Sequence, residues 1–147
     1  RLGLRVRVLE KAALPGGKWS GHGIYECVQI QQHKHDFFLP GVPWSEATPA
    51  FATRDNMVSA TDEYIAKYGL MSHIECRSEV ISCTFDEAVQ LWHVKTSAGA
   101  VYSARFLAWA VGTLGPPHIP TQVTKALKDF KGDVVHSHAY YRPLPYR

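Results

Sequence analysis

The sequence predicts an α/β fold in which a small antiparallel β-meander interrupts a layer of helices and better-buried strands. Two patterns lead to this prediction. Residues 55–69 carry apolar side chains near a 3.6-residue period, whereas residues 74–111 alternate apolar and polar side chains around short turns. With 147 residues, of which 46% are hydrophobic and 20% charged, the chain has the composition of one globular domain or of a piece of one.

The first predicted strand covers residues 5–10, where valine alternates with arginine. A proline followed by two glycines then breaks the chain into a loop. A second strand is predicted at residues 24–30. Residues 31–49 mix prolines with aromatic side chains, so we expect an irregular loop that covers a packed surface.

The clearest helix begins after Thr53 or Asp55, either of which can cap it, and ends at Gly69. Its apolar side chains recur at helical spacing, so we expect them to pack into a core. These side chains are Met57, Ala60, Tyr64, Ile65 and Tyr68.

The predicted meander has three strands, at residues 74–85, 91–96 and 101–111. Asp86-Glu87 forms the turn between the first two. Residues 106–111 are continuously apolar, which is typical of a strand buried on both faces, so we expect this part to return to the central layer. Gly112 would end it.

Beyond a proline-rich connection, residues 123–130 predict a short helix and residues 133–137 a last short strand.

Charge and cysteine content exclude several classes of protein. The net charge of +3 is small, and no basic block interleaves with aromatic residues, so we expect no nucleic-acid partner. Three cysteines without a C-x-x-C pair fit a reducing compartment, which predicts a cytoplasmic protein. No apolar run reaches the roughly 20 residues of a transmembrane helix.

Glu10 stands at the end of the first predicted strand, directly before the glycine loop. In a dinucleotide-binding βαβ unit, a carboxylate at the end of the second strand accepts hydrogen bonds from the adenosine ribose, and the glycine-rich phosphate loop lies about 20 residues earlier. That loop would then precede residue 1. The pattern predicts part of a Rossmann-like layer; the alternative is that Glu10 is an ordinary solvated residue at a strand end.

Three stretches match motifs of one family in the same order. Residues 10–19 (EKAALPGGKW) match E-K-x(4-5)-G-G-x-W, and residues 130–142 (FKGDVVHSHAYYR) carry F-x-G-x-x-x-H-S-x-x-Y. Between them, residues 24–44 resemble a region that ends in an aromatic-proline loop. Together they resemble the flavin-containing monooxygenases, class B flavoproteins related to the Baeyer-Villiger enzymes. The glutamine at position 31 makes this region more similar to the plant-type members of the family than to the animal ones. The last motif closes on a tyrosine, whereas the Baeyer-Villiger version closes on a tryptophan.

The resemblance implies roles for the first motif. Glu10 would bind the ribose of FAD, with Lys11 beside it. Gly17, Lys18 and Trp19 would line the pyrophosphate and ribityl side, where glycine lets the backbone approach the cofactor closely.

It implies roles for later residues as well. Gln31 would lie near the reactive edge of the flavin, as the candidate catalytic residue, and the main chain of Val80 would contact the adenine. Gly112 would lie near the cofactor, although Val111 replaces the usual threonine before it. The remaining motif would couple the FAD lobe to the NADPH lobe through Phe130, Gly132, His136, Ser137 and Tyr140.

As a whole, the resemblance implies an FAD- and NADPH-dependent monooxygenase of the N,N-dimethylaniline monooxygenase type. Such an enzyme uses dioxygen to oxygenate a soft nucleophile, an amine or sulfide, through a flavin peroxide. Residues 1–147 would be a partial FAD-binding domain with an inserted β-meander, starting after the first phosphate-binding loop and ending before the NADPH-binding domain.

Three alternatives stay open at this stage. The chain could be a catalytically silent protein that binds a nucleotide or a partner. It could belong to a two-dinucleotide flavoprotein reductase, although the redox C-x-x-C of the disulfide reductases is absent. The pairs His33/His35 and His136/His138 could ligate a metal, but neither has a third ligand at a convincing spacing, so we expect no metal site.

Overall fold

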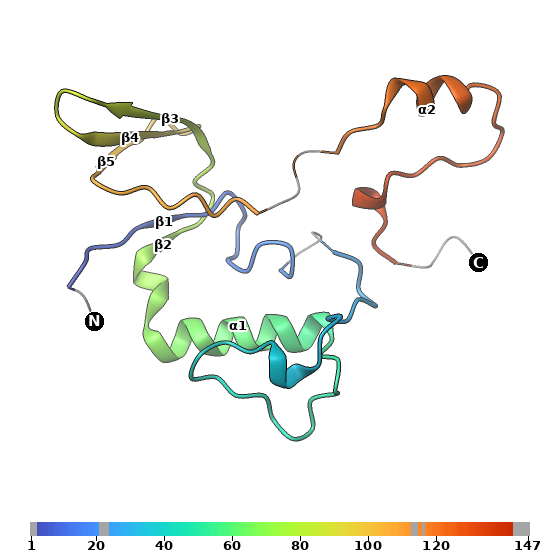
Figure 1. Cartoon of the computed structure of the whole chain (residues 1–147), viewed down its shortest axis with the longest axis horizontal. Helices are drawn as coiled ribbons and strands as arrows, with labels where there is room; N and C mark the ends of the chain where they lie inside the picture. Colours follow the sequence, from blue (N-terminus) through green and yellow to red (C-terminus); the bar gives the residue numbers. More distant parts are fainter. Residues whose placement is uncertain (1–2, 21–23, 113–114, 116, 143–147) are drawn as a thin grey trace.

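Helix α1 (Arg54–Tyr68) is the longest regular element of the chain (Figure 1). The computed structural model describes residues 3–20, 24–112, 115 and 117–142. Thr53 caps the helix: its hydroxyl accepts the Asn56 N–H at 3.3 Å, and the Asn56 side chain accepts the Thr53 N–H at 3.0 Å. This capping box satisfies two backbone donors of the first turn. Gly69 closes the other end at φ +62°, so the predicted helix and both of its ends are confirmed.

The buried face of α1 packs on the loops that precede it. Ile30, Ala52 and Met57 form a core cluster, and Trp19 and Trp44 pack against it. Of the five side chains expected in the core, Met57, Ala60 and Ile65 are buried.

Tyr68 was expected in this core, and that prediction is wrong. Its side chain is 41% exposed and its hydroxyl donates to the Pro40 carbonyl at 3.3 Å. The hydroxyl needs a polar partner, and the irregular loop beside the helix supplies one.

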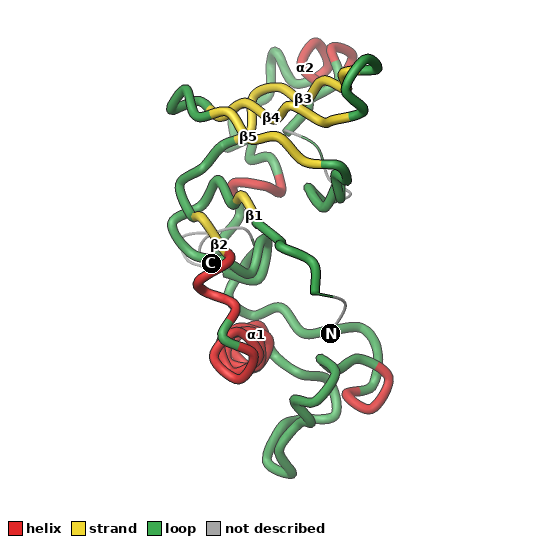
Figure 2. Tube along the Cα trace, turned by 90° about the vertical axis from the view of Figure 1, so that its left-hand side faces the viewer, coloured by secondary structure: helices red, strands yellow, loops and turns green. Residues whose placement is uncertain are grey.

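The predicted meander is confirmed in its antiparallel order, but two of its three strands have other bounds. The strand predicted at 74–85 is divided, because Ile74–Glu75 pairs with another part of the chain, and the strand predicted at 101–111 ends at Ala104. Strands β3 (Val80–Asp86), β4 (Leu91–Thr96) and β5 (Val101–Ala104) form one antiparallel sheet in that order. The Asp86 carboxylate accepts the Ala88 and Val89 N–H groups and thereby closes the first turn. Figure 2 shows this sheet at the opposite end of the molecule from α1.

A short parallel strand pair lies between the meander and α1. Strand β1 (Val8–Leu9) pairs with β2 (Ile74–Glu75), with Val8 opposite Ile74. The first predicted strand is therefore real, but only two of its residues form ladder pairs. A helix, a parallel pair and an antiparallel sheet together make the chain α/β.

The last part of the third predicted strand, residues 106–111, forms no strand, so this part of the prediction is wrong. No strand of the described residues pairs with this segment, and Phe106 and Trp109 are 79% and 69% exposed. An apolar run predicts burial, but a strand forms only where a neighbouring strand accepts its hydrogen bonds.

Three other predicted elements differ from those in the structure. Residues 24–30 contribute only an isolated bridge, between Gln29 and Thr53. The predicted strand at 133–137 is absent, and a 3₁₀ turn, η3 (Ser137–Ala139), begins at its last residue. Helix α2 (Thr121–Ala126) begins earlier than expected and is short. Further 3₁₀ turns are η1 (Lys34–Asp36) and η2 (Leu70–His73).

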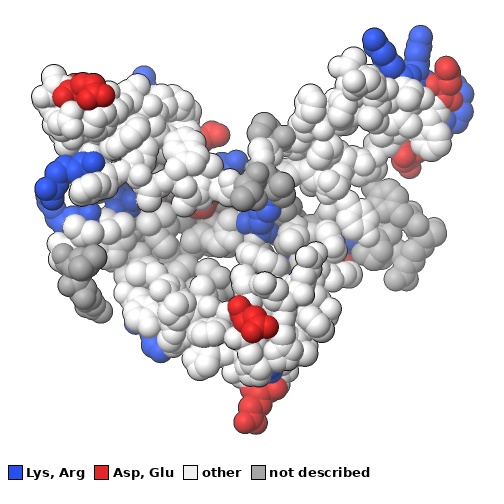
Figure 3. Space-filling view, viewed as in Figure 1, with Lys and Arg blue, Asp and Glu red and all other residues white. Residues whose placement is uncertain are grey.

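Charged side chains are dispersed over the face shown in Figure 3, with small groups of Lys and Arg near α2 and beside β1. They form no continuous basic stripe on this face. Within the described ranges, the helices are all too short or too polar to cross a bilayer.

Candidate cofactor site

Glu10 is fixed at the end of β1 by β2 and by the segment that follows β2. Its N–H donates to the Glu75 carbonyl at 2.9 Å, and its own carbonyl accepts the Ser78 N–H at 2.9 Å. One carboxylate oxygen, Oε1, accepts the Ala12 N–H at 2.8 Å. The second oxygen has no hydrogen-bond partner among the described residues, so a half-buried carboxylate presents one acceptor at the carboxyl end of a parallel strand.

The glycine loop turns tightly beyond Glu10. Gly16 and Gly17 have φ of +110° and +56°, a backbone region that favours glycine. The Trp19 N–H donates to the Gly16 carbonyl at 3.2 Å, and the Ser20 hydroxyl donates to the Gly17 carbonyl at 3.1 Å. The turn exposes Lys18 and directs Trp19 toward the core cluster.

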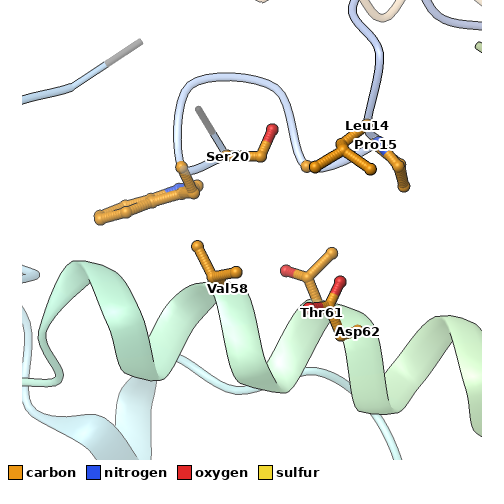
Figure 4. A pocket seen from close by; sticks show the side chains of 8 residues that line it. Leu14, Pro15, Ser20, Val58, Thr61 and Asp62 are labelled. Atoms are coloured by element: carbon orange, nitrogen blue, oxygen red, sulfur yellow. The ribbon is translucent and has the colours of Figure 1, made fainter. Parts of the chain in front are cut away.

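A small cavity separates this loop from α1 (Figure 4). Its volume is about 120 Å³, below the roughly 300–1,000 Å³ of ligand pockets, so it can hold only part of a dinucleotide. Asp62 at its wall disfavours phosphate and can accept hydrogen bonds from hydroxyl groups. The lining residues are Leu14, Pro15, Gly16, Trp19, Ser20, Val58, Thr61 and Asp62.

Three further predicted site residues are neighbours in sequence of residues that contact Glu10 or the core cluster. Val80 begins β3 two residues after Ser78, whose amide contacts Glu10. Gln31 is exposed and follows Ile30, a member of the core cluster against which Trp19 packs. Lys11 is exposed beside Glu10.

Among the described residues, the hydrogen bonds of Glu10 go to Glu75, Ser78 and Ala12, and none joins it to the remaining predicted residues. Gly112 lies outside any strand at φ +84°. In the last motif, Phe130 packs so closely over Gly132 that a Cβ there would clash with its ring. His136 Nδ1 accepts the His138 N–H at 3.0 Å, and the Tyr140 ring meets Tyr25 edge-on at 5.6 Å.

The carboxylate acceptor and the glycine turn fit the ribose end of a dinucleotide. A vicinal diol needs an acceptor at the strand end, which the second Glu10 oxygen provides, and a backbone without side chains beside it, which the glycine turn provides. A phosphate-binding helix N-terminus beside Glu10 does not occur within the described residues.

Sequence reasoning missed two contact networks around this region. The Glu75 carboxylate accepts hydrogen bonds from Tyr102, Ser78 and Arg7, at 2.6, 3.1 and 2.7 Å. Arg54 contacts Tyr141, 87 residues away. Arginine at the first position of a helix opposes the helix dipole, and that local conflict is the signal that could have pointed to a tertiary partner for Arg54.

The two histidine pairs form no metal site in the part of the chain that is described. There, no group of three or more His, Cys, Asp or Glu side chains is placed to hold an ion.

Comparison with known proteins gives three informative relatives. The phenazine N-monooxygenase PhzNO1 of Lysobacter antibioticus is 28% identical over 95% of this chain and 26% of its own length. The indole-3-pyruvate monooxygenase YUCCA1 of Oryza sativa subsp. japonica is 28% identical over 94% of this chain and 33% of its own. The cyclohexanone 1,2-monooxygenase of an Acinetobacter species is 37% identical over 92% of this chain and 25% of its own.

Among solved structures, an oxidized steroid monooxygenase bound to NADP is similar to this fold. Its TM-score is 0.70 at 28% identity, covering 80% of this chain and 23% of that one. The chain thus spans about a quarter to a third of the length of its first curated relatives.

The family model for flavin-binding monooxygenase-like proteins matches residues 16–147. This range includes the glycine turn, α1, the meander and the last motif. The relatives are all monooxygenases, and FAD and NADPH are the cofactors of the family. The chain therefore belongs to the flavin-binding monooxygenase-like family.

Proposed function

We propose that residues 1–147 form part of the FAD-binding domain of an FAD- and NADPH-dependent monooxygenase. This part would start after the first phosphate-binding loop and end before the NADPH-binding domain. The observation that carries the proposal is the available carboxylate oxygen of Glu10, at the end of a parallel strand and beside a turn with two glycines at positive φ. The chain covers 26% and 33% of the length of two relatives, which supports the proposal that it forms one part of such an enzyme.

Glu10 would accept a hydrogen bond from the adenosine ribose through its second oxygen. The Ala12 N–H holds the first oxygen, so the carboxylate is already oriented before a ligand arrives and loses little rotamer freedom on binding. The main chain of Val80, at the start of β3, would contact the adenine next to it.

The glycine turn and Trp19 would bind the middle of the cofactor. Gly17 lets the backbone approach a sugar or ribityl chain, and the exposed Lys18 ammonium would pair with phosphate. Trp19, packed on the core cluster, would exclude water from that side.

Reduced FAD supplies the activation of dioxygen when it is bound. The Gln31 side chain, exposed on the loop beside the core cluster, would place its amide at the reactive edge and donate a hydrogen bond there. Gly112 and the residues from Phe130 to Tyr140 would join this lobe to the NADPH-binding one.

The substrate we propose is a soft nucleophile, an amine or a sulfide, as expected for an enzyme of the N,N-dimethylaniline monooxygenase type. A relative named for N-oxygenation of phenazine supports this class. The 37% identity to a cyclohexanone monooxygenase favours a second candidate, oxygenation of a ketone. Two alternative functions stay open: a catalytically silent protein that binds a nucleotide or a partner, and a two-dinucleotide flavoprotein reductase.

The test is titration of the purified protein with FAD, followed by flavin fluorescence and visible absorbance. We expect saturable quenching with one FAD per chain. A protein that leaves flavin fluorescence unchanged would overturn the proposal for this chain.

The substrate classes are separated by product analysis with NADPH and air, on an enzyme that contains these residues together with the phosphate-binding loop and the NADPH-binding domain proposed to flank them. The soft-nucleophile proposal predicts an N-oxide or sulfoxide from a tertiary amine or thioether. An ester from a cyclic ketone would favour the second candidate. NADPH oxidation with reduction of an added acceptor and no oxygenated product would favour the reductase, and FAD binding without NADPH oxidation would favour the silent protein.

A further inference from the structure

Arg54 joins the start of α1 to the end of the described chain. Its Nη1 donates to the Tyr141 hydroxyl at 2.9 Å, and its guanidinium carbon lies 5.7 Å from the centroid of the Tyr141 ring. The Arg54 side chain is only 18% exposed. A hydrogen bond and a ring contact from the same guanidinium define the position of the tyrosine in more than one direction.

Two further contacts hold the same end of the chain. The Glu26 N–H donates to the Tyr141 carbonyl at 3.0 Å, and the Tyr25 and Tyr140 rings meet at 5.6 Å with an interplanar angle of 65°. Residues 140–141 therefore lie along residues 25–26, on the loop that leads to Gln31.

Arg54 also connects to this loop through its backbone. Its N–H donates to the Val28 carbonyl at 3.0 Å, next to the isolated bridge between Gln29 and Thr53. One residue thus contacts both partners: the loop through its main chain and Tyr141 through its side chain.

The guanidinium is suited to this role. Its Nε and Nη2 both donate to the Asp55 carboxylate, at 3.1 and 3.0 Å, which leaves Nη1 for Tyr141. The planar fork cannot rotate without breaking all three bonds, whereas a lysine could supply only a point charge. Asp55 also offsets the unfavourable charge at the helix N-terminus.

We propose that Arg54 is a positioning residue that seats Tyr141, and with it the end of the motif at 130–142, on the loop that carries Gln31. The proposal rests on the proposed function, in which that motif joins the FAD lobe to the NADPH lobe. Its consequence is that the orientation of the joining segment depends on Arg54, which lies outside the motifs at residues 10–19 and 130–142. FAD binding at Glu10 does not depend on it.

The most direct test is amide hydrogen exchange at Glu26, because its N–H is bonded to Tyr141. We expect Arg54→Met and Tyr141→Phe each to speed this exchange by roughly tenfold or more, since each removes a hydrogen bond to a charged group. Amides within α1 should be unaffected. Arg54→Lys, which keeps the charge and one donor, should recover part of the protection. Arg105→Met is the matched control, because it also removes a guanidinium beside a ring, that of Phe106.

Two measurements distinguish positioning from general destabilisation. The double variant Arg54→Met/Tyr141→Phe should exchange no faster than Arg54→Met alone, because the hydrogen bond that Tyr141→Phe removes is already lost in Arg54→Met. With FAD bound, the visible circular dichroism of the flavin should change in both single variants while FAD affinity stays at the wild-type value.

Unchanged Glu26 exchange in Tyr141→Phe would overturn the inference, and this holds even if Arg54→Met fails to fold. Additive effects in the double variant would overturn it too. A wild-type protein that binds no FAD would instead contradict the proposed function, while the exchange rates would still decide whether Arg54 seats Tyr141.

Discussion

Tyr102 of β5 donates a 2.6 Å hydrogen bond to the Glu75 carboxylate of β2, and so ties the meander to the parallel strand pair. Arg7 completes the network: its Nη1 donates to the other Glu75 oxygen at 2.7 Å, and its guanidinium carbon lies 4.8 Å from the centroid of the Tyr102 ring. Because the Glu75 carbonyl accepts the Glu10 N–H, this network also fixes the residue proposed to bind FAD.

The hydrogen bond between Tyr102 and Glu75 predicts how stability depends on pH. It lowers the pKa of Glu75 from its ordinary value of 4.5 and raises the pKa of Tyr102 from its ordinary value of 10.0. The carboxylate contribution is present above pH 4.5 and is lost as pH falls through the lowered pKa. The tyrosine contribution is present below pH 10.0 and is lost as pH rises through the raised pKa.

Tyr102→Phe should therefore lower Tm by a constant amount between these limits, and by less on either side. Thermal unfolding of both proteins across the pH range measures this difference. Tyr64→Phe, a half-buried tyrosine on α1, is the control and should show no such profile. A Tyr102→Phe deficit that keeps its full size well below pH 4.5 would contradict the assignment.

Gly41→Ala should be more destabilising than Gly99→Ala, although both glycines have positive φ, +80° and +87°. Each substitution costs about 1–2 kcal/mol for the left-handed conformation. At Gly41 the new methyl group would also overlap the Tyr68 hydroxyl, whereas nothing lies within 4 Å at Gly99. Overpacking adds about 1–3 kcal/mol.

The free energy of unfolding, measured in denaturant, checks this prediction. Equal losses for the two variants would mean that Tyr68 does not pack against the Gly41 loop.

Thr53→Ala should destabilise the protein by about 1 kcal/mol, because it removes the acceptor for the Asn56 N–H at the start of α1. Thr53→Ser keeps that acceptor and should retain most of the stability. Ser59→Ala, at an exposed position within the same helix, is the control and should be neutral or slightly stabilising. Chemical denaturation compares the three, and a Thr53→Ala variant as stable as wild type would show that the capping box contributes nothing.

Elements specified by local residues could be predicted from the sequence. The cap at Thr53, the left-handed Gly69 and the turn closed by Asp86 each depend on side chains within a few positions. The strand at 106–111 could not be predicted correctly, since an apolar pattern does not reveal whether a neighbouring strand is present. Tyr68 was misplaced for a related reason: its partner, the Pro40 carbonyl, lies 28 residues away.

The candidate site shows the same difference between features specified by neighbouring residues and features that depend on distant ones. Glu10 and the glycine turn could be predicted because they are contiguous in the sequence. The contact of Arg54 with Tyr141 and that of Tyr102 with Glu75 could not, because they join residues 87 and 27 positions apart. Only the folded chain brings these side chains together.

The central claim is that the Glu10 carboxylate binds a sugar hydroxyl of FAD. Glu10→Gln keeps a carbonyl oxygen for the Ala12 N–H and removes the charge, so the local turn should survive. Glu63→Gln, at an exposed position on α1, is the matched control.

The decisive measurement is the dissociation constant for FAD of these two variants and of the wild type, by flavin fluorescence titration. Loss of a charge-assisted hydrogen bond predicts roughly 10- to 100-fold weaker binding for Glu10→Gln and unchanged binding for Glu63→Gln. If Glu10→Gln binds FAD as tightly as the wild type, Glu10 does not bind the ribose and the account is contradicted.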